Sequence, residues 1–483
     1  MLPLVVAAAV AFAPGCTLQR QGVEEVASAL ERQAQHAPGE AEAYARTPAQ
    51  PTAEFVRPAD GAGPQPDPQG LREFIVRALA ENPSIKAAQD RARAQAERIA
   101  QVMALPDPML KTKTLPEPIR TAEGDNFFIL GVSQKLPVPE KLDRAGRMAL
   151  DETRMALARL NETRLSVIAQ VKRAYFQLYV IDKSLAVTAE NQQLLRGLID
   201  VARAQVAAGR RAQDDVLRVQ VETSKLQADL IVLRQRRVSV AASLNRLLDR
   251  PSATSIATPM DFGIRQADLS LDDLLARAAR ANPALKRLER QIDREQHAVE
   301  LARLAYWPDF TVGFEWLSME PRDAFQPPRN PETGKRPTVS RMSERGSDNW
   351  AVTFGFNLPI WFDKIEAGIR EARYRLAATR REYDAARNRV DFEIADALER
   401  VRSQRALAVL FDGTIIPQAR QTYQVSQASY VAGRSDFLYV IDNWQKWLVF
   451  TVQYYRSLGE LERSVADLEQ AIGMSLTESG AAP

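Results

Sequence analysis

The feature that most constrains this chain is an internal duplication. The stretch LREFIVRALAENPSIK begins at Leu71 and LDDLLARAARANPALK begins at Leu271, with Asn-Pro at the same place in both. In each copy there follow a helical pattern, two alternating stretches around a polar loop, and a long helical segment that reaches a glycine and returns. Because so many landmarks agree in order, we predict two copies of one structural unit, over residues 71–260 and 261–473, with a tail at 474–483.

The alternating stretches predict two strands in each copy, because apolar and polar residues succeed each other with period 2. In the second copy, tryptophans stand near both ends of the strands: Trp307 and Trp361 at one end, Trp316 and Trp350 at the other. An apolar outward face between two aromatic girdles is typical of membrane barrels, although any one stretch also fits a soluble sandwich. The predicted apolar face comprises Phe128, Leu130, Val132, Phe310, Val312, Phe314, Trp316, Trp350, Val352, Phe354 and Phe356.

Four strands are too few to close a barrel, and lipid does not tolerate an open sheet edge. If these strands cross a membrane, several chains must therefore contribute to one barrel. Beyond the N-terminal region, no stretch approaches the roughly 18 apolar residues that a spanning helix needs. The sequence thus predicts that any membrane span would be made of strands.

Two long helical segments run from Lys141 to Gly209 and from Lys364 to Gly433. At 1.5 Å per residue each would span roughly 100 Å, and its heptad-like apolar spacing is typical of coiled-coil packing. Pro417 lies inside the second segment and predicts a kink there, either as a hinge or as a static bend. Helices of this kind alone would also fit an exported soluble coiled-coil scaffold, which is the alternative interpretation.

The N-terminus predicts export. Residues 1–15, MLPLVVAAAVAFAPG, form a short apolar run that ends in small residues, as in a signal peptide, although no Lys or Arg precedes the run. The chain's single cysteine, Cys16, follows at once and resembles a lipidation site; the alternative is a chance cysteine after an ordinary signal peptide. Because residues 37–70 are rich in Pro, Ala and Gly, we expect residues 16–70 to form a lipid-anchored flexible linker.

Composition excludes several functions. The formal net charge is only +3, which argues against a nucleic-acid binder with a concentrated basic face. With one cysteine and two histidines, the chain has too few of these ligands for a metal site built from His or Cys, which is therefore almost excluded. The sequence shows no nucleophile with a partner base and no phosphate-binding loop, so we predict no enzyme and no cofactor. A secreted enzyme is the competing class, and a specific hydrolytic activity would reveal it.

At this point the chain resembles the TolC-like outer-membrane factor family. The resemblance covers residues 71–473 and rests on the two Asn-Pro helix openings, the two Leu-Pro strand endings, and the glycine tips VAAGRRAQDDVLRVQ (206–220) and YVAGRSDFLYVIDNW (430–444). It implies a mostly α-helical homotrimer in which each chain supplies four strands to one shared barrel and long helices to a periplasmic tunnel. It further implies a lipid-anchored outer-membrane exit duct of a tripartite efflux or type I secretion system, with a periplasmic adaptor and an inner-membrane pump as partners.

The tips are the predicted functional site. Gly209 and Gly433 would allow the chain to reverse there. In the resembled family this end is held nearly closed by ion pairs and hydrogen bonds, which a docked adaptor loosens. The alternative is that these are ordinary surface charges beside a turn. The gate candidates are Arg210, Arg211, Asp214, Asp215, Arg434, Asp436, Tyr439 and Asp442.

Overall fold

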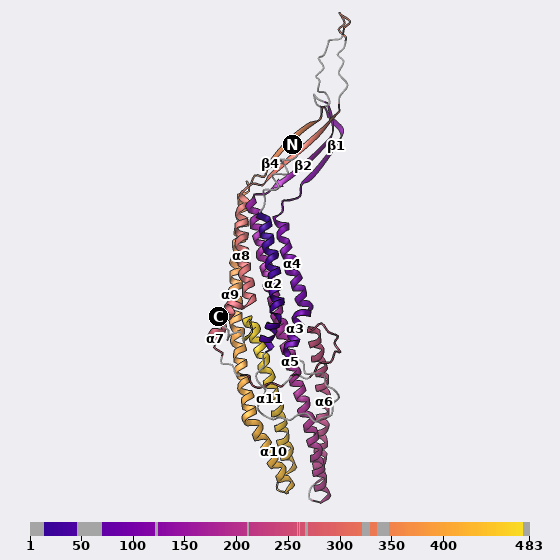
Figure 1. Ribbon diagram of the computed structural model, residues 1–483, viewed down its shortest axis with the longest axis vertical. Helices are drawn as coiled ribbons and strands as arrows, with labels where there is room; N and C mark the ends of the chain where they lie inside the picture. Colours follow the sequence, from indigo (N-terminus) through magenta and orange to yellow (C-terminus); the bar gives the residue numbers. More distant parts are fainter. Residues whose placement is uncertain are drawn as a thin grey trace. The chain divides into compact units, whose positions relative to one another are not determined.

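A computed structural model describes residues 14–45, 70–120, 124–209, 212–257, 259, 261–265, 269–320, 329–335 and 347–476. The chain divides into two compact units. The first unit holds the sheet and the helix segments within residues 95–153 and 291–380, together with the start of the N-terminal helix. The second unit holds the remaining helices, including both long-helix tips. Figure 1 shows the order of the elements along the chain.

The same order of elements occurs twice, as the duplication predicted. Each copy has a short helix, a second helix, two strands, and a long helical hairpin. No helix in the described part of the chain combines the length and apolar character needed to cross a membrane. The first copy comprises α3 (Leu71–Glu81), α4 (Pro83–Met103), β1 (Met109–Arg120), β2 (Asp125–Leu136), α5 (Pro139–Ala207) and α6 (Asp214–Leu247). The second comprises α7 (Leu271–Ala281), α8 (Pro283–Arg303), η1 (Leu304–Tyr306), β3 (Phe310–Glu320), β4 (Asn349–Phe356), α9 (Phe362–Leu410), η2 (Phe411–Ile415), α10 (Ile416–Val431) and α11 (Phe437–Ile472).

The duplicated Asn-Pro motif has a structural role in both copies. Asn82 accepts a hydrogen bond from the Ser84 amide at 2.9 Å, which satisfies a free N–H at the start of α4. Its side-chain amide also donates to the Leu247 carbonyl at the end of α6, at 2.9 Å. Asn282 repeats both contacts: it accepts a hydrogen bond from the Ala284 amide at 2.9 Å and donates to the Ala471 carbonyl at the end of α11, at 2.7 Å. Each motif therefore caps one helix and ties it to the end of the returning helix.

The four strands form one antiparallel sheet in the order β1-β2-β3-β4. Paired residues lie on the same face, so the register tests the predicted alternation. It pairs Val312 with Phe354 and Phe314 with Val352, and these side chains lie on one face as predicted. Phe354 is 78% exposed, which leaves this apolar face uncovered within the single chain. Among the described residues, β1 and β4 are the edge strands, and their outer sides have no partner strand.

The N-terminal region differs from the expected linker. Helix α2 runs over Pro14–Ala45, so the first part of the predicted flexible segment 16–70 is helical. In the second unit, Glu25 accepts two hydrogen bonds from the Arg154 guanidinium, at 3.0 and 2.8 Å. In the first unit, a side chain added at Gly22 would collide with Ile99, so α2 packs closely on α4 there. The expectation drawn from the Pro- and Gly-rich composition of residues 37–70 was therefore wrong for residues 16–45, which include the first nine residues of that stretch. Residues 46–69 lie outside the described part.

The two long hairpins differ in one respect. Helix α5 is continuous over 69 residues, whereas its counterpart is interrupted by a π-helical turn, η2, between α9 and α10. Pro417 stands in the first turn of α10, directly after this interruption. Proline has no backbone N–H and therefore makes no hydrogen bond to the preceding helical turn. A π-helical turn is one way to accommodate that missing hydrogen bond. A helical irregularity therefore lies directly before Pro417, while the kink itself stays a prediction.

Candidate gate at the two helical tips

Both glycines predicted to reverse the chain adopt the backbone conformation that favours glycine. Gly209 has φ of 69° and Gly433 has φ of 76°, both in the left-handed region. Each amide closes its turn by donating to the carbonyl three residues earlier, on Val206 and Tyr430 respectively, at 2.9 Å. A Cβ at either position would meet nothing within 4 Å. Backbone conformation, and not lack of space, therefore favours glycine at these tips.

The charged candidates of the second tip mainly make local contacts. Asp436 is the N-cap of α11 and accepts a hydrogen bond from the Leu438 amide at 3.2 Å. Asp442 pairs with Lys446 one turn further along the same helix, at 2.7 Å. Arg434 is exposed, and Tyr439 is 63% exposed. The acidic members of this set therefore support their own helix, while Arg434 and Tyr439 face outward from the chain.

The first tip contains one local ion pair and one buried acid. Asp214 accepts a hydrogen bond from Arg218 at 3.0 Å, an exposed pair within the first turns of α6. The neighbouring Asp215 is buried instead. The predicted candidates Arg210 and Arg211 lie outside the described residues. Adjacent aspartates therefore have different surroundings, which the sequence alone could not show.

Asp215 connects the two tips. The buried Tyr430 hydroxyl, at the end of α10, donates to Asp215 Oδ2 at 3.1 Å. A longer hydrogen bond runs beside it, from Gln205 Nε2 to the Val431 carbonyl at 3.4 Å. Sequence reasoning missed Tyr430, although it stands three residues before Gly433 inside the tip motif. Its position in that motif was the available signal, but only the fold shows which acid it meets.

The hydrogen bond rests on an aromatic cluster shared by the two hairpins. The Tyr430 ring packs against Phe437 with centroids 4.9 Å apart, and Trp444 Nε1 donates to Asn191 Oδ1 at 2.8 Å. Tyr423 stacks on Trp447, but among the described residues its buried hydroxyl has no hydrogen-bond partner. Burial accordingly raises the pKa of Tyr423 to about 12. The remaining buried members are Leu195, Leu198, Val219, Leu226, Val440 and Ile441.

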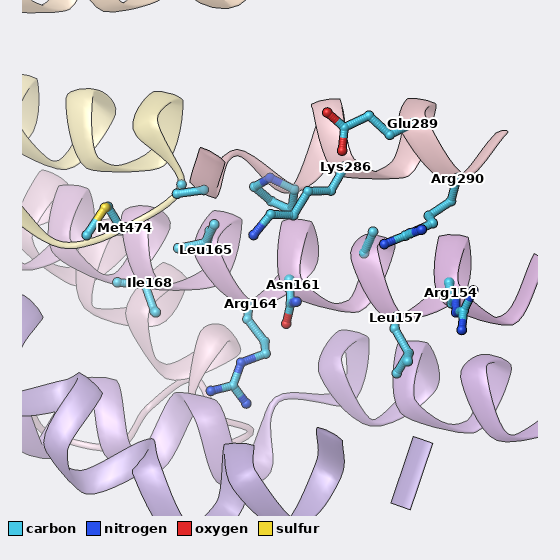
Figure 2. A pocket seen from close by; sticks show the side chains of 14 residues that line it. Arg154, Leu157, Asn161, Arg164, Leu165, Ile168, Lys286, Glu289, Arg290 and Met474 are labelled. Carbon is cyan, nitrogen blue, oxygen red and sulfur yellow. The ribbon is translucent and has the colours of Figure 1, made fainter. Parts of the chain in front are cut away.

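A second candidate site is a basic cavity of about 620 Å³ in the same unit, lined by α5, the α7–α8 junction and the end of α11. In Figure 2, Lys286 reaches across the cavity while Glu289 points away from it. The Arg154 side chain on its wall is held by Glu25. Within the described ranges, no group of three or more His, Cys, Asp or Glu is placed to hold a metal ion. The lining supplies positive charge but no arrangement of a nucleophile with a base.

Both copies of the repeat match a known protein family. The sequence profile of the family described as outer membrane efflux protein matches residues 74–250 and 274–474, which together make up most of the chain. The chain belongs to the outer membrane efflux protein family. The two matched ranges follow the duplication found in the sequence, and the resemblance drawn from the duplicated Asn-Pro, Leu-Pro and glycine-tip motifs is confirmed.

Among relatives of this outer membrane efflux protein, the cobalt-zinc-cadmium resistance protein CzcC of Cupriavidus metallidurans is 22% identical over 426 residues, covering 86% of this chain and 92% of CzcC. The outer membrane protein VceC from Vibrio cholerae superimposes with a TM-score of 0.67 at 17% identity, covering 83% of this chain and 96% of VceC. The open-state Neisseria gonorrhoeae MtrE channel gives 0.67 at 16% identity, covering 89% and 99%. The similar solved structures show which fold this chain has. Membership of the family shows that the chain is an outer-membrane efflux channel. The alternative interpretation, an exported soluble coiled-coil scaffold, finds no support.

Proposed function

We propose that three copies of this chain form the exit duct of a tripartite efflux or type I secretion system, with the strands closed into one barrel. The observation that carries the proposal is the open four-stranded sheet with an uncovered apolar face, joined to a duplicated long helical hairpin. An apolar face in lipid removes that surface from water, and pairing β4 of one chain with β1 of the next removes both edges. Such a duct conducts passively and needs no catalytic group.

We further propose that the tips form its closed end. The Asp215–Tyr430 hydrogen bond holds α6 and α10 together inside each chain, so the two hairpins cannot separate without breaking it. Arg434 and Tyr439 are exposed, and we expect them to contact a neighbouring chain or a docked partner. Exposed ion pairs contribute only about 0–1 kcal/mol each, so we assign the larger share of the closure to the buried contact.

The partners follow from this role: two further copies of the chain, a periplasmic adaptor at the tips, and an inner-membrane pump. We also propose that Cys16 carries the lipid anchor at the outer membrane, since it directly follows the signal-peptide-like residues 1–15. Mass spectrometry of the mature protein tests this, and we expect an acylated N-terminal cysteine. An unmodified Cys16, or an N-terminus elsewhere, would contradict lipidation while leaving the duct proposal intact.

The duct itself is tested with the purified full-length protein in detergent and then in planar bilayers. We expect a native mass of three chains, each of 53.9 kDa before processing and acylation, and ion-conducting insertions into the bilayer. A monomer that never conducts would refute the proposal. Co-purification from native membranes with an adaptor and a pump would identify the rest of the assembly.

A further inference from the structure

The sheet face opposite the apolar one carries an uneven charge. In β1, Lys111 and Lys113 alternate with Leu110 and Thr112, and both lysines are exposed. Lys111 pairs with Gly131, so the two lysines lie on the face opposite the apolar Leu110–Val132 pair. Successive residues of β1 therefore alternate between the charged face and the apolar face of the sheet.

The register shows what lies across the sheet from each lysine. The row of Lys111 continues through Gly131 to Glu315 and ends at Ala351. Because Gly131 has no side chain, Glu315 lies over it, and a Cβ at Gly131 would come within 3.1 Å of Glu315 Cγ. Even so, no lysine nitrogen in the described sheet lies within 4.0 Å of the Glu315 carboxylate. Glu315 therefore balances part of the charge of Lys111 without pairing with it.

The positive charge of Lys113 is not balanced by an acidic residue in its own row of the sheet. Its row contains Ile129, Leu317 and Asn349, none of which is charged. The third lysine of this face, Lys135, is paired with Asp309 at 3.1 Å. In these rows each chain therefore presents two lysines against one glutamate, and Lys113 has no charged neighbour along its row.

We infer that this face forms a polyanion-binding ring in the conducting path, and that the duct favours solutes that carry several negative charges. The inference rests on the proposed trimer, in which the apolar face meets lipid and the opposite face lines the bore. Three chains would place six lysines and three glutamates around that bore, because β4 of each neighbour adds only Ala351 and Asn349 to these rows. Rings of lysine or arginine are how pores select anions and phosphates.

The width of the bore determines which anions can interact with the lysines on its wall. A barrel of twelve strands encloses a water-filled channel, and charges are screened beyond about 8 Å at physiological salt. A small monovalent anion in the centre would hardly sense the wall. A polyanion that reaches several lysines at once gains several charge-assisted hydrogen bonds, so it would bind the ring and obstruct the current.

The test uses inositol hexakisphosphate as the probe on single trimers in planar bilayers, in 0.1 M KCl. Added to the compartment that the sheet faces, the probe should block the current of the wild-type channel. The K111Q/K113Q double variant should need at least about tenfold more probe for half-block, since each lost charge-assisted bond is worth a factor of this size. K111R/K113R keeps the charge and should restore the block, whereas E315Q should strengthen it.

Adding the probe to the opposite compartment distinguishes a binding site on the sheet from one near the tips. If the probe blocks the current only from that side, the anion site does not lie on the sheet. The inference is overturned if the probe does not block the conducting wild type, or if K111Q/K113Q is blocked as strongly as K111R/K113R. A wild-type protein that stays monomeric and never conducts would instead refute the proposed duct. The E315Q variant keeps both lysines, so its stronger block is expected even if the glutamine double variant fails to insert.

Discussion

The contact between the two tips makes a sharp prediction for Tyr430→Phe. The substitution removes only the hydroxyl that donates to Asp215, and it leaves the aromatic packing on Phe437 in place. Since the contact is buried, Asp215 would lose one donor without a direct replacement by water. Losing one partner of a buried polar group costs about 1–3 kcal/mol, and three equivalent contacts per trimer could weaken the closed end by about 3–9 kcal/mol if they break together.

Tyr423→Phe is the matched control. It removes the same atom from the same helix and the same cluster, but this hydroxyl has no hydrogen-bond partner in the described structure. Removing a buried hydroxyl that makes no bond should be neutral or slightly stabilising, because its desolvation cost disappears as well. The pair of variants therefore separates the hydrogen bond from the general effect of changing a tyrosine at the tip.

The assay is channel conductance in planar bilayers, combined with hydrogen exchange of the tip amides. We expect Tyr430→Phe to open more often or further than wild type and to exchange faster around Gly209 and Gly433, while Tyr423→Phe matches wild type. If the two variants behave alike, the Asp215–Tyr430 hydrogen bond does not hold the tips. The closure would then rest on contacts between chains, with Arg434 and Tyr439 the first to examine.

Three further results are expected. Val352→Arg places a charge on the apolar face of β4 and should reduce stability in bilayers by about 2–4 kcal/mol, whereas Thr353→Arg on the opposite face should be far milder; equal losses in refolding titrations would contradict the proposed lipid face. Lys172→Met removes the cationic partner of the buried Glu469, which keeps the Leu476 amide as a donor, and should cost about 3–5 kcal/mol in chemical denaturation, much of it recovered by adding Glu469→Leu. Burial raises the pKa of Asp412, so its folded form holds a proton more tightly than the unfolded chain, and the contribution of Asp412 to stability should fall as pH rises above its ordinary value of 3.8. Relative to wild type, Asp412→Asn should remove that contribution from the stability profile measured against pH.

The sequence could predict the repeated architecture because its signals are local. Alternation with period 2 fixes which residues share a face of a strand, and the register confirmed it for Phe314 and Val352. A glycine that ends a long helical pattern predicts where the chain reverses, and Gly209 and Gly433 both have left-handed backbone conformations. These features depend on a few neighbouring residues, so they can be recognised without any knowledge of distant contacts.

Tertiary structure decided which of the charged residues could act together. Asp214 and Asp215 are adjacent in sequence, yet one pairs with Arg218 on its own helix and the other meets Tyr430, 215 residues away along the chain. Only the packing of the two hairpins determines which aspartate is buried, because a rotation of about 100° per residue around a helix sends neighbours to different sides. The same packing gives the Tyr430 hydroxyl a hydrogen-bond partner and leaves the Tyr423 hydroxyl without one among the described residues. The sequence alone thus determined where the chain turns, and the fold determined which contact joins the turns.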